Sequence, residues 1–245
     1  MLMKTKIEIP TSIVSYTPSS PCEMCLLNRN CVGSQIRKAF ADSSRFRSFR
    51  SFSVKSYEHL YFSGDQIEAL YIVKSGSFKT YVTNQGGDEQ IINFHLAGDI
   101  LSLDALPTHH FQSSAVALEA SSLCVIPSLY FENLVKEFVP DWLIDVLMGQ
   151  LSQQQRKMSS LGKKNARRRI AAFLCDISDN YQALGYSGRE IRLNMSREDI
   201  GNYLGLASET ISRMLTKMRK EGVVKLNRQN VKIVDYEQLC KLADR

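Results

Sequence analysis

The sequence predicts an α+β protein with three consecutive parts: an antiparallel β-domain, one long helix, and a small helical domain that ends in a β-hairpin. Three observations predict this order. Short β-prone runs alternate with regularly spaced glycines in the first half, a heptad pattern follows Pro140, and two short helices precede two more β-prone runs near the C-terminus. With 245 residues, 44% of them hydrophobic, the chain can bury a core in each of two modest domains.

The β-domain is predicted from glycine spacing. Gly64, Gly76, Gly87 and Gly98 lie 12, 11 and 11 residues apart and separate the β-prone runs ALYIV, SFKTYV and QIINFHL. Hairpins at this interval are typical of an antiparallel sandwich or roll. The alternating stretch AVALEASSLCVIP ends the series, and SLYFENLVKEFVP after it has helical spacing.

A long helix is predicted from Pro140 onward, because proline suits the first turn of a helix. Its apolar positions step by three and four residues, in an a/d heptad register. The seam consists of Ile144, Leu147, Leu151, Gln154, Met158 and Leu161. Such a seam packs either on its own domain or on a second copy of the helix. The single uncharged polar residue, Gln154, favours a homodimer, since one polar residue in a seam commonly sets its register.

The C-terminal helices have the pattern of a helix-turn-helix. Ser196 and Asp199 form a capping pair, Gly205 supplies a tight turn, and Ser208 is expected to cap a second helix that runs to about Lys220. The runs VVKL and VKIV around NRQN then predict a wing. This region is also basic, because residues 151–245 carry 19 Lys and Arg against 10 Asp and Glu. Double-stranded DNA is therefore the expected partner.

The second of these helices carries the candidate base-reading residues. Glu209, Ser212 and Arg213 share one face near its start, where the recognition helix of a helix-turn-helix reaches the major groove. Arg suits guanine O6 and N7, and Glu accepts from cytosine N4. Ser208 and Thr210 complete the candidate DNA-binding set. The basic stretch KKNARRRIAAFLCDISDN before them predicts an amphipathic helix, whose charged side chains are typically solvated rather than bound to DNA.

Three cysteines, Cys22, Cys25 and Cys31, lie within ten residues near the N-terminus. The preceding segment lacks the apolar core of a signal peptide, and no window reaches the roughly 18 apolar residues of a membrane helix. We therefore expect a cytoplasmic protein without a membrane partner, in which grouped thiols hold a metal or act as redox groups. Zinc, a nest of disulfides and an iron-sulfur cluster all remain open. Cys175 and Cys240 lie in predicted helices and are interpreted as ordinary apolar residues.

With these motifs the chain resembles the Fnr proteins of the Crp-Fnr superfamily of transcription regulators, over nearly its whole length. The resemblance rests on the cysteine group and on the stretches GDEQIINFHLAGDILSLDAL, ALEASSLCVIP, KKNARRRIAAFL and LNMSREDIGNYLGLASETISRML. It implies an N-terminal β-roll of the cyclic-nucleotide-binding type, a long dimerisation helix and a C-terminal winged helix-turn-helix. The implied parts are a cluster-binding segment at 1–34, a β-roll sensor at 35–139, a dimerisation helix at 140–162 and a DNA-binding domain at 163–245.

The resemblance also implies an oxygen-sensing global regulator of anaerobic and respiratory genes that works with RNA polymerase. Members bind palindromes of TTGAT half-sites through an E-x-x-S-R motif, which falls here on Glu209, Ser212 and Arg213. Their cluster pattern of C-x2-C-x5-C plus one distant cysteine maps onto Cys22, Cys25, Cys31 and Cys124. Four thiolates match a [4Fe-4S] cluster. The implied regulator binds DNA as a dimer when it carries this cluster.

Cyclic nucleotide is not expected as a ligand. The stretches AGDILSLDAL and FQSSAVALE, where nucleotide-binding members carry a phosphate-binding Arg, contain none, and a phosphate buried without a cation is costly. The alternative within the same fold is a regulator that senses redox change through its thiols or holds structural zinc, without an iron-sulfur cluster. An iron-sulfur enzyme would need an open iron site, and the sequence contains no convincing catalytic constellation, so we expect no enzyme activity.

Overall fold

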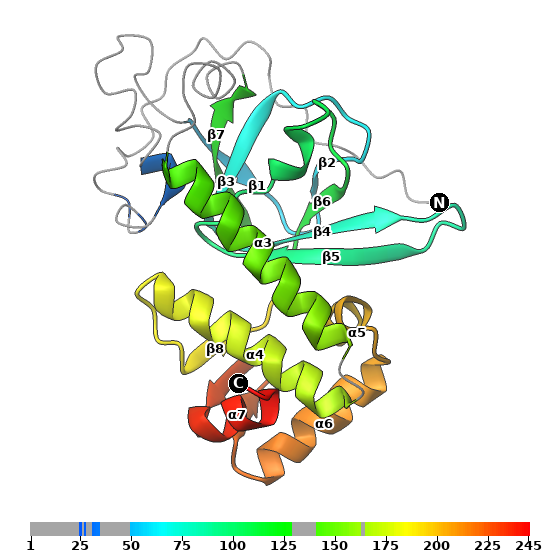
Figure 1. Cartoon of the computed structure of the whole chain (residues 1–245), viewed down its shortest axis with the longest axis vertical. Coiled ribbons are helices and arrows are strands. Elements are labelled where there is room, and N and C mark those ends of the chain that lie inside the picture. Colours follow the sequence, from blue (N-terminus) through cyan, green and yellow to red (C-terminus); the bar gives the residue numbers. More distant parts are fainter. Residues whose placement is uncertain (1–24, 26, 28–30, 35–49, 129–140, 163–164) are drawn as a thin grey trace. The chain divides into compact units, whose positions relative to one another are not determined.

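The computed structural model of the chain describes residues 25, 27, 31–34, 50–128, 141–162 and 165–245 (Figure 1). The chain divides into two compact units, Met1–Val146 and Leu147–Arg245. The division falls inside the long helix α3, Asp141–Leu161, so this helix contributes residues to both units. In the described part of the chain, no helix combines the length and the apolar character needed to cross a bilayer.

The N-terminal unit contains two antiparallel sheets, with strand orders β1-β7-β3 and β2-β6-β4-β5 (Figure 1). Strand β7 pairs with both β1 and β3, so the last strand lies beside the first. This arrangement confirms the predicted β-roll. The strands are β1 Arg50–Val54, β2 His59–Tyr61, β3 Ala69–Ser75, β4 Phe78–Thr83, β5 Glu89–His95, β6 Ser114–Ala117 and β7 Ser121–Pro127.

The regularly spaced glycines lie at turns of this roll, and all four have positive φ angles between 85° and 95°. Gly76 has a second constraint, because a Cβ atom there would lie 2.8 Å from the backbone Cα of Ser121. The turn between β3 and β4 therefore packs directly against the start of β7. The helix expected in SLYFENLVKEFVP lies outside the described residues, apart from Ser128.

The interior of the roll is filled by aliphatic and aromatic side chains. Val73, Phe78 and Leu123 are fully buried. The rings of Tyr61 and Phe111 stack with centroids 3.6 Å apart, and the Tyr61 hydroxyl donates to the Leu101 carbonyl at 2.6 Å. The inward-facing positions of the β-prone runs thus form the core, as their alternation predicts.

The C-terminal unit confirms the predicted winged helix-turn-helix. Helix α4 packs against both α6 and α7, and a three-stranded sheet has the order β8-β10-β9. The strand β8 has only three residues and was not predicted. The elements are α4 Ala166–Ala183, β8 Glu190–Arg192, α5 Arg197–Leu204, α6 Ser208–Lys220, β9 Val224–Asn227, β10 Asn230–Ile233 and α7 Tyr236–Ala243.

Candidate functional site

The turn between α5 and α6 is fixed by local chemistry at both ends of α5. Ser196 and Asp199 form the predicted capping box, in which the Asp199 N–H donates to the Ser196 hydroxyl at 2.9 Å. Gly205 ends the helix in the left-handed conformation, with φ 63°. Gly201 is equally constrained, because a Cβ atom there would lie under 3.0 Å from the Leu206 carbonyl oxygen. This third constraint was not predicted from the sequence.

Helix α6 buries one face and exposes the other. Ile211, Leu215 and Met218 are buried, and this spacing of four and three residues seats the helix on its own unit. The prediction that Ser208 caps the helix is wrong. The N-cap is Ala207, whose carbonyl accepts the Ile211 N–H at 3.1 Å, and no side chain caps this end.

The three residues predicted to read DNA lie together on the exposed face of α6. Glu209, Ser212 and Arg213 are exposed, whereas Ser208 and Thr210 are half-buried. The first three side chains make no hydrogen bond or ion pair with any other residue that the structure describes. Their polar groups therefore point to solvent from the first two turns of the helix, which is the part that contacts base edges in helix-turn-helix proteins.

The arginines at the start of α4 bind their own unit rather than forming the simple solvated face that was expected. Arg169 donates to the carbonyl oxygens of Leu204 at 3.1 Å and Gly205 at 3.5 Å, which ties α4 to the turn of the helix-turn-helix. Arg167 forms an ion pair with Glu221 just after α6. These two side chains therefore brace the recognition helix at both ends.

The wing presents further cations that sequence reasoning did not single out. Strands β9 and β10 pair in the register Asn227↔Asn230, and Arg228 lies in the turn between them with φ 52°. Arg228 and Lys225 are exposed. Their signal in the sequence was only the basic composition of the region, because their prominence depends on the hairpin register.

Two of the N-terminal cysteines lie near one another. Cys25 is half-buried, and Cys31 is buried at the start of a helical turn. Burial raises the pKa of the Cys31 thiol, whereas hydrogen bonds from the backbone N–H groups of Ser34 and Gly33 lower it; the charge of Cys25 raises it further. N–H groups directed at a sulfur stabilise a thiolate and are among the contacts that tune iron-sulfur ligands. Cys25 and Cys31 would supply two of the sulfur ligands of a thiolate-bound metal group.

Of the other two predicted ligands, the structure describes only Cys124. Cys124 is half-buried in the middle of β7, opposite Ser51 on β1 and Ile72 on β3. Cys22 lies outside the described residues. Within the described ranges, no three His, Cys, Asp or Glu side chains gather as a metal site. The complete set of four thiols thus stays a prediction.

Comparison with known proteins decides the family. The family model of the Crp-like helix-turn-helix domain matches residues 168–242, and that of the cyclic nucleotide-binding domain matches residues 52–138. The fumarate and nitrate reduction regulatory protein of Escherichia coli K12 is 35% identical over 224 residues, covering 91% of this chain and 90% of that protein. The chain belongs to the Crp/Fnr family of transcription regulators. It is therefore a DNA-binding regulator and not an enzyme.

Two further relatives agree with this assignment. The fumarate nitrate reduction regulatory protein of Klebsiella oxytoca is also 35% identical over 91% of this chain and 90% of its own length. The solved structure of FixK2 from Bradyrhizobium japonicum superposes with a TM-score of 0.72 at 27% identity, covering 80% of this chain and 98% of that one. The roll and the helix-turn-helix are thus the two halves of a Crp/Fnr protein.

In this Crp/Fnr protein, Asp104 lies in the stretch AGDILSLDAL of the roll, between β5 and β6. The Ser113 hydroxyl donates to Asp104 Oδ2 at 2.7 Å, and Asp104 Oδ1 is buried without a partner among the described residues. Burial raises the pKa of the Asp104 carboxyl, opposed by hydrogen bonds that include the one from Ser113.

The predicted dimer seam lies open on α3. Ile144, Leu147, Leu151 and Met158 are 48%, 44%, 52% and 73% exposed, and Gln154 is exposed as well. The side-chain surroundings of Leu161 lie outside the description. Apolar residues repeated at heptad spacing on a surface mark an interaction site.

The last turns of α3, which belong to the C-terminal unit, contact other helices of that unit. Lys157 Nζ lies 4.0 Å from the centre of the Tyr203 ring on α5, and Arg156 Nε lies 3.9 Å from Asp176 Oδ1 on α4. Burial lowers the pKa of Lys157 to about 8. These contacts use positions of α3 other than the seam residues.

Proposed function

We propose that this Crp/Fnr protein is an oxygen-responsive transcription regulator that binds palindromes of two TTGAT half-sites as a homodimer. The observation that carries the DNA assignment is the exposed face of α6, where Glu209, Ser212 and Arg213 have no other partner among the described residues. Arg213 would donate to O6 and N7 of a guanine, and Glu209 would accept from N4 of a cytosine. Lys225 and Arg228 on the wing would neutralise phosphates without reading sequence.

Dimerisation is supported by the exposed heptad seam of α3. Pairing of two such helices would bury Ile144, Leu147, Leu151 and Met158 against their counterparts, while Gln154 meets its two-fold mate without charge repulsion. A two-fold dimer presents two recognition helices one DNA turn apart, about 34 Å, which matches two half-sites of a palindrome. The DNA-bound dimer would then act on RNA polymerase.

Oxygen sensing is assigned to Cys22, Cys25, Cys31 and Cys124. The paired thiols of Cys25 and Cys31, with backbone N–H groups directed at Cys31, support a thiolate-ligated cofactor. A [4Fe-4S] cluster held by the four thiols would supply an oxygen-labile link between the N-terminal segment and the roll. Cys124 precedes the start of α3 by only 17 residues, so a restraint at β7 lies close in sequence to the seam. Release of the segment would weaken pairing and DNA binding together.

Anaerobic reconstitution followed by iron, sulfide and zinc analysis tests the cofactor. We expect about four irons and four sulfides per chain. Cys124→Ser should lose them, whereas Cys240→Ser, a substitution of a cysteine outside the predicted ligand set, should keep them. Stoichiometric zinc without sulfide, or full iron content in Cys124→Ser, would contradict the assignment. The same measurement excludes a purely thiol-based redox sensor if iron and sulfide are present.

A further inference from the structure

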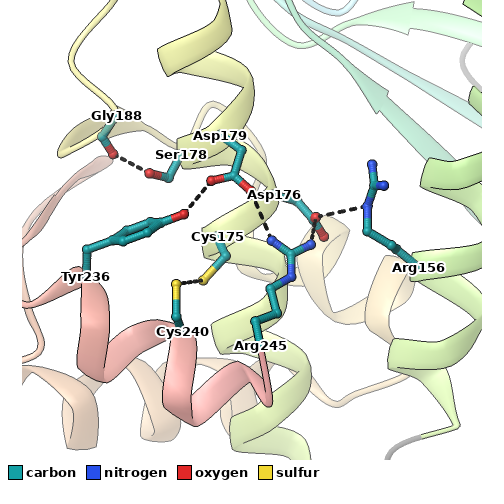
Figure 2. A network of polar contacts seen from close by, with 9 residues as sticks. All are labelled: Arg156, Cys175, Asp176, Ser178, Asp179, Gly188, Tyr236, Cys240 and Arg245. Carbon is teal, nitrogen blue, oxygen red and sulfur yellow. Dashed lines mark hydrogen bonds and ion pairs between the residues drawn. The ribbon is translucent and has the colours of Figure 1, made fainter. Parts of the chain in front are cut away.

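Two cysteines outside the predicted cluster meet in the C-terminal unit (Figure 2). The Sγ atoms of Cys175 on α4 and Cys240 on α7 are 3.9 Å apart, although 65 residues separate them in the chain. Cys175 is fully buried, whereas Cys240 is half-buried. A disulfide has an S–S length of about 2.05 Å, so bond formation requires the sulfurs to approach by roughly 2 Å.

A network of polar contacts holds α7 in its position against α4. The Tyr236 hydroxyl donates to Asp179, and the terminal Arg245 donates to Asp179 at 3.0 Å and to Asp176 (Figure 2). These contacts lie on both sides of the sulfur pair along α7. The two sulfurs are thus held next to each other by contacts of Tyr236 and Arg245 with α4, and Tyr236 also hydrogen-bonds to Cys240, so less entropy is lost when the sulfurs join.

We propose that Cys175 and Cys240 form a reversible disulfide when the protein meets a hydroperoxide, which staples α7 to α4. The Cys240 thiolate attacks one peroxide oxygen, the O–O bond breaks, and Cys240 becomes a sulfenic acid while water or an alcohol leaves. The Cys175 sulfur then attacks the Cys240 sulfur while its own proton passes to the departing hydroxide, so the S–O bond breaks, the S–S bond forms and water leaves. Two thiols are oxidised, and one peroxide is reduced.

The order of these steps follows from burial. Burial raises the pKa of Cys175 to about 12, so this thiol stays protonated, and it is also closed to solvent. Cys240 has a partly exposed sulfur-bearing side chain and therefore meets the oxidant first. The finished bond closes a loop that contains α5, α6 and the wing, so it constrains the unfolded state of the whole DNA-reading region.

Peptide mapping of the oxidised full-length protein tests this site without reference to the iron-sulfur cluster. The protein is treated with hydrogen peroxide, alkylated, and digested with trypsin without reduction. We expect residues 170–189 to be joined to residues 233–241, at a mass two hydrogens below the sum, and the link to vanish after reduction with dithiothreitol. The melting temperature of the C-terminal unit should rise by at least about 5 °C on oxidation.

Cys240→Ser is the matched control, because its half-buried position tolerates a hydroxyl and the core at Cys175 stays intact. This variant should show neither the linked peptides nor the rise in melting temperature. The proposal would be overturned if the peptides of Cys175 and Cys240 were both recovered in alkylated form from a sample whose N-terminal cysteines had been oxidised. Recovery of Cys240 as sulfinic acid or bonded to a cysteine other than Cys175 would also overturn it.

Discussion

A single methyl group at Gly201 should disrupt the DNA-binding unit. Gly201 lies in the last part of α5, and an added Cβ would lie under 3.0 Å from the Leu206 carbonyl oxygen, a separation that real Cβ atoms essentially never show. The Leu206 N–H also donates to the Gly201 carbonyl at 2.9 Å, so the clashing residue is held close by its own hydrogen bond. Gly201→Ala must therefore move the turn away from α5.

The magnitude follows from three opposing contributions. Alanine is favoured over glycine inside a helix by about 1 kcal/mol. Overpacking against a fixed backbone costs about 1–3 kcal/mol, and loss of the Leu206 hydrogen bond costs about 1 kcal/mol. The clash outweighs the propensity, so we expect Gly201→Ala to lower the free energy of unfolding of the C-terminal unit by about 1–3 kcal/mol. DNA affinity should fall as well, because the turn sets the position of α6.

Urea unfolding followed by far-UV circular dichroism measures this change. Gly149→Ala is the matched control, since Gly149 also lies inside a helix but a Cβ there meets nothing within 4 Å. The control should be stabilised by roughly 0.5–1 kcal/mol. A Gly201→Ala protein as stable as the original chain, with unchanged DNA affinity in fluorescence anisotropy, would refute the packing argument.

Three further outcomes are expected. Arg213→Ala should weaken binding to a TTGAT palindrome by about 1–3 kcal/mol and relax selectivity at one base pair, whereas Arg228→Ala should weaken all duplexes equally; anisotropy with point-mutated sites separates them. Leu151→Asp should shift the equilibrium toward monomer in analytical sedimentation, because it places two like charges in the seam. A dimer of unchanged stability would contradict the assignment of α3 as the interface. Burial lowers the pKa of His95 to about 4 from 6.5, so the unfolded chain binds more protons and stability falls as pH drops from 6.5 toward 4. In urea unfolding, His95→Leu should remove about 3 kcal/mol of the stability that the protein loses between pH 6.5 and pH 4. If the free energy of unfolding of the variant depended on pH as that of the original chain does, the buried neutral imidazole would be contradicted.

The helix-turn-helix was predictable because its signals are local. The capping box of Ser196 and Asp199 and the left-handed Gly205 act within a few residues of where they stand, and the structure contains both. The first residue of α6 was harder to predict, since a helix can begin without a side-chain cap when burial of Ile211 and Leu215 holds it in place. This is why the predicted Ser208 cap failed although the helix itself was correct.

Contacts between distant residues escaped prediction. Arg169 binds the carbonyl oxygens of the α5–α6 turn, and a backbone acceptor leaves no pattern in the sequence. Strand β8 has three residues, too few to show alternation, and exists because β10 pairs with it. Cys175 and Cys240 were interpreted from the sequence as two unrelated apolar residues, because only the packing of α7 on α4 brings their sulfurs together.

Oxygen sensing and DNA binding belong to one mechanism only if one change removes both. The most direct measurement exposes anaerobically reconstituted protein to air in steps and records visible absorbance and anisotropy of a TTGAT duplex in the same sample. We expect the broad cluster absorbance and the DNA affinity to fall in parallel, and the Cys124→Ser protein to show neither from the start. DNA binding that persists in air at undiminished affinity after the absorbance is gone would contradict the proposed coupling.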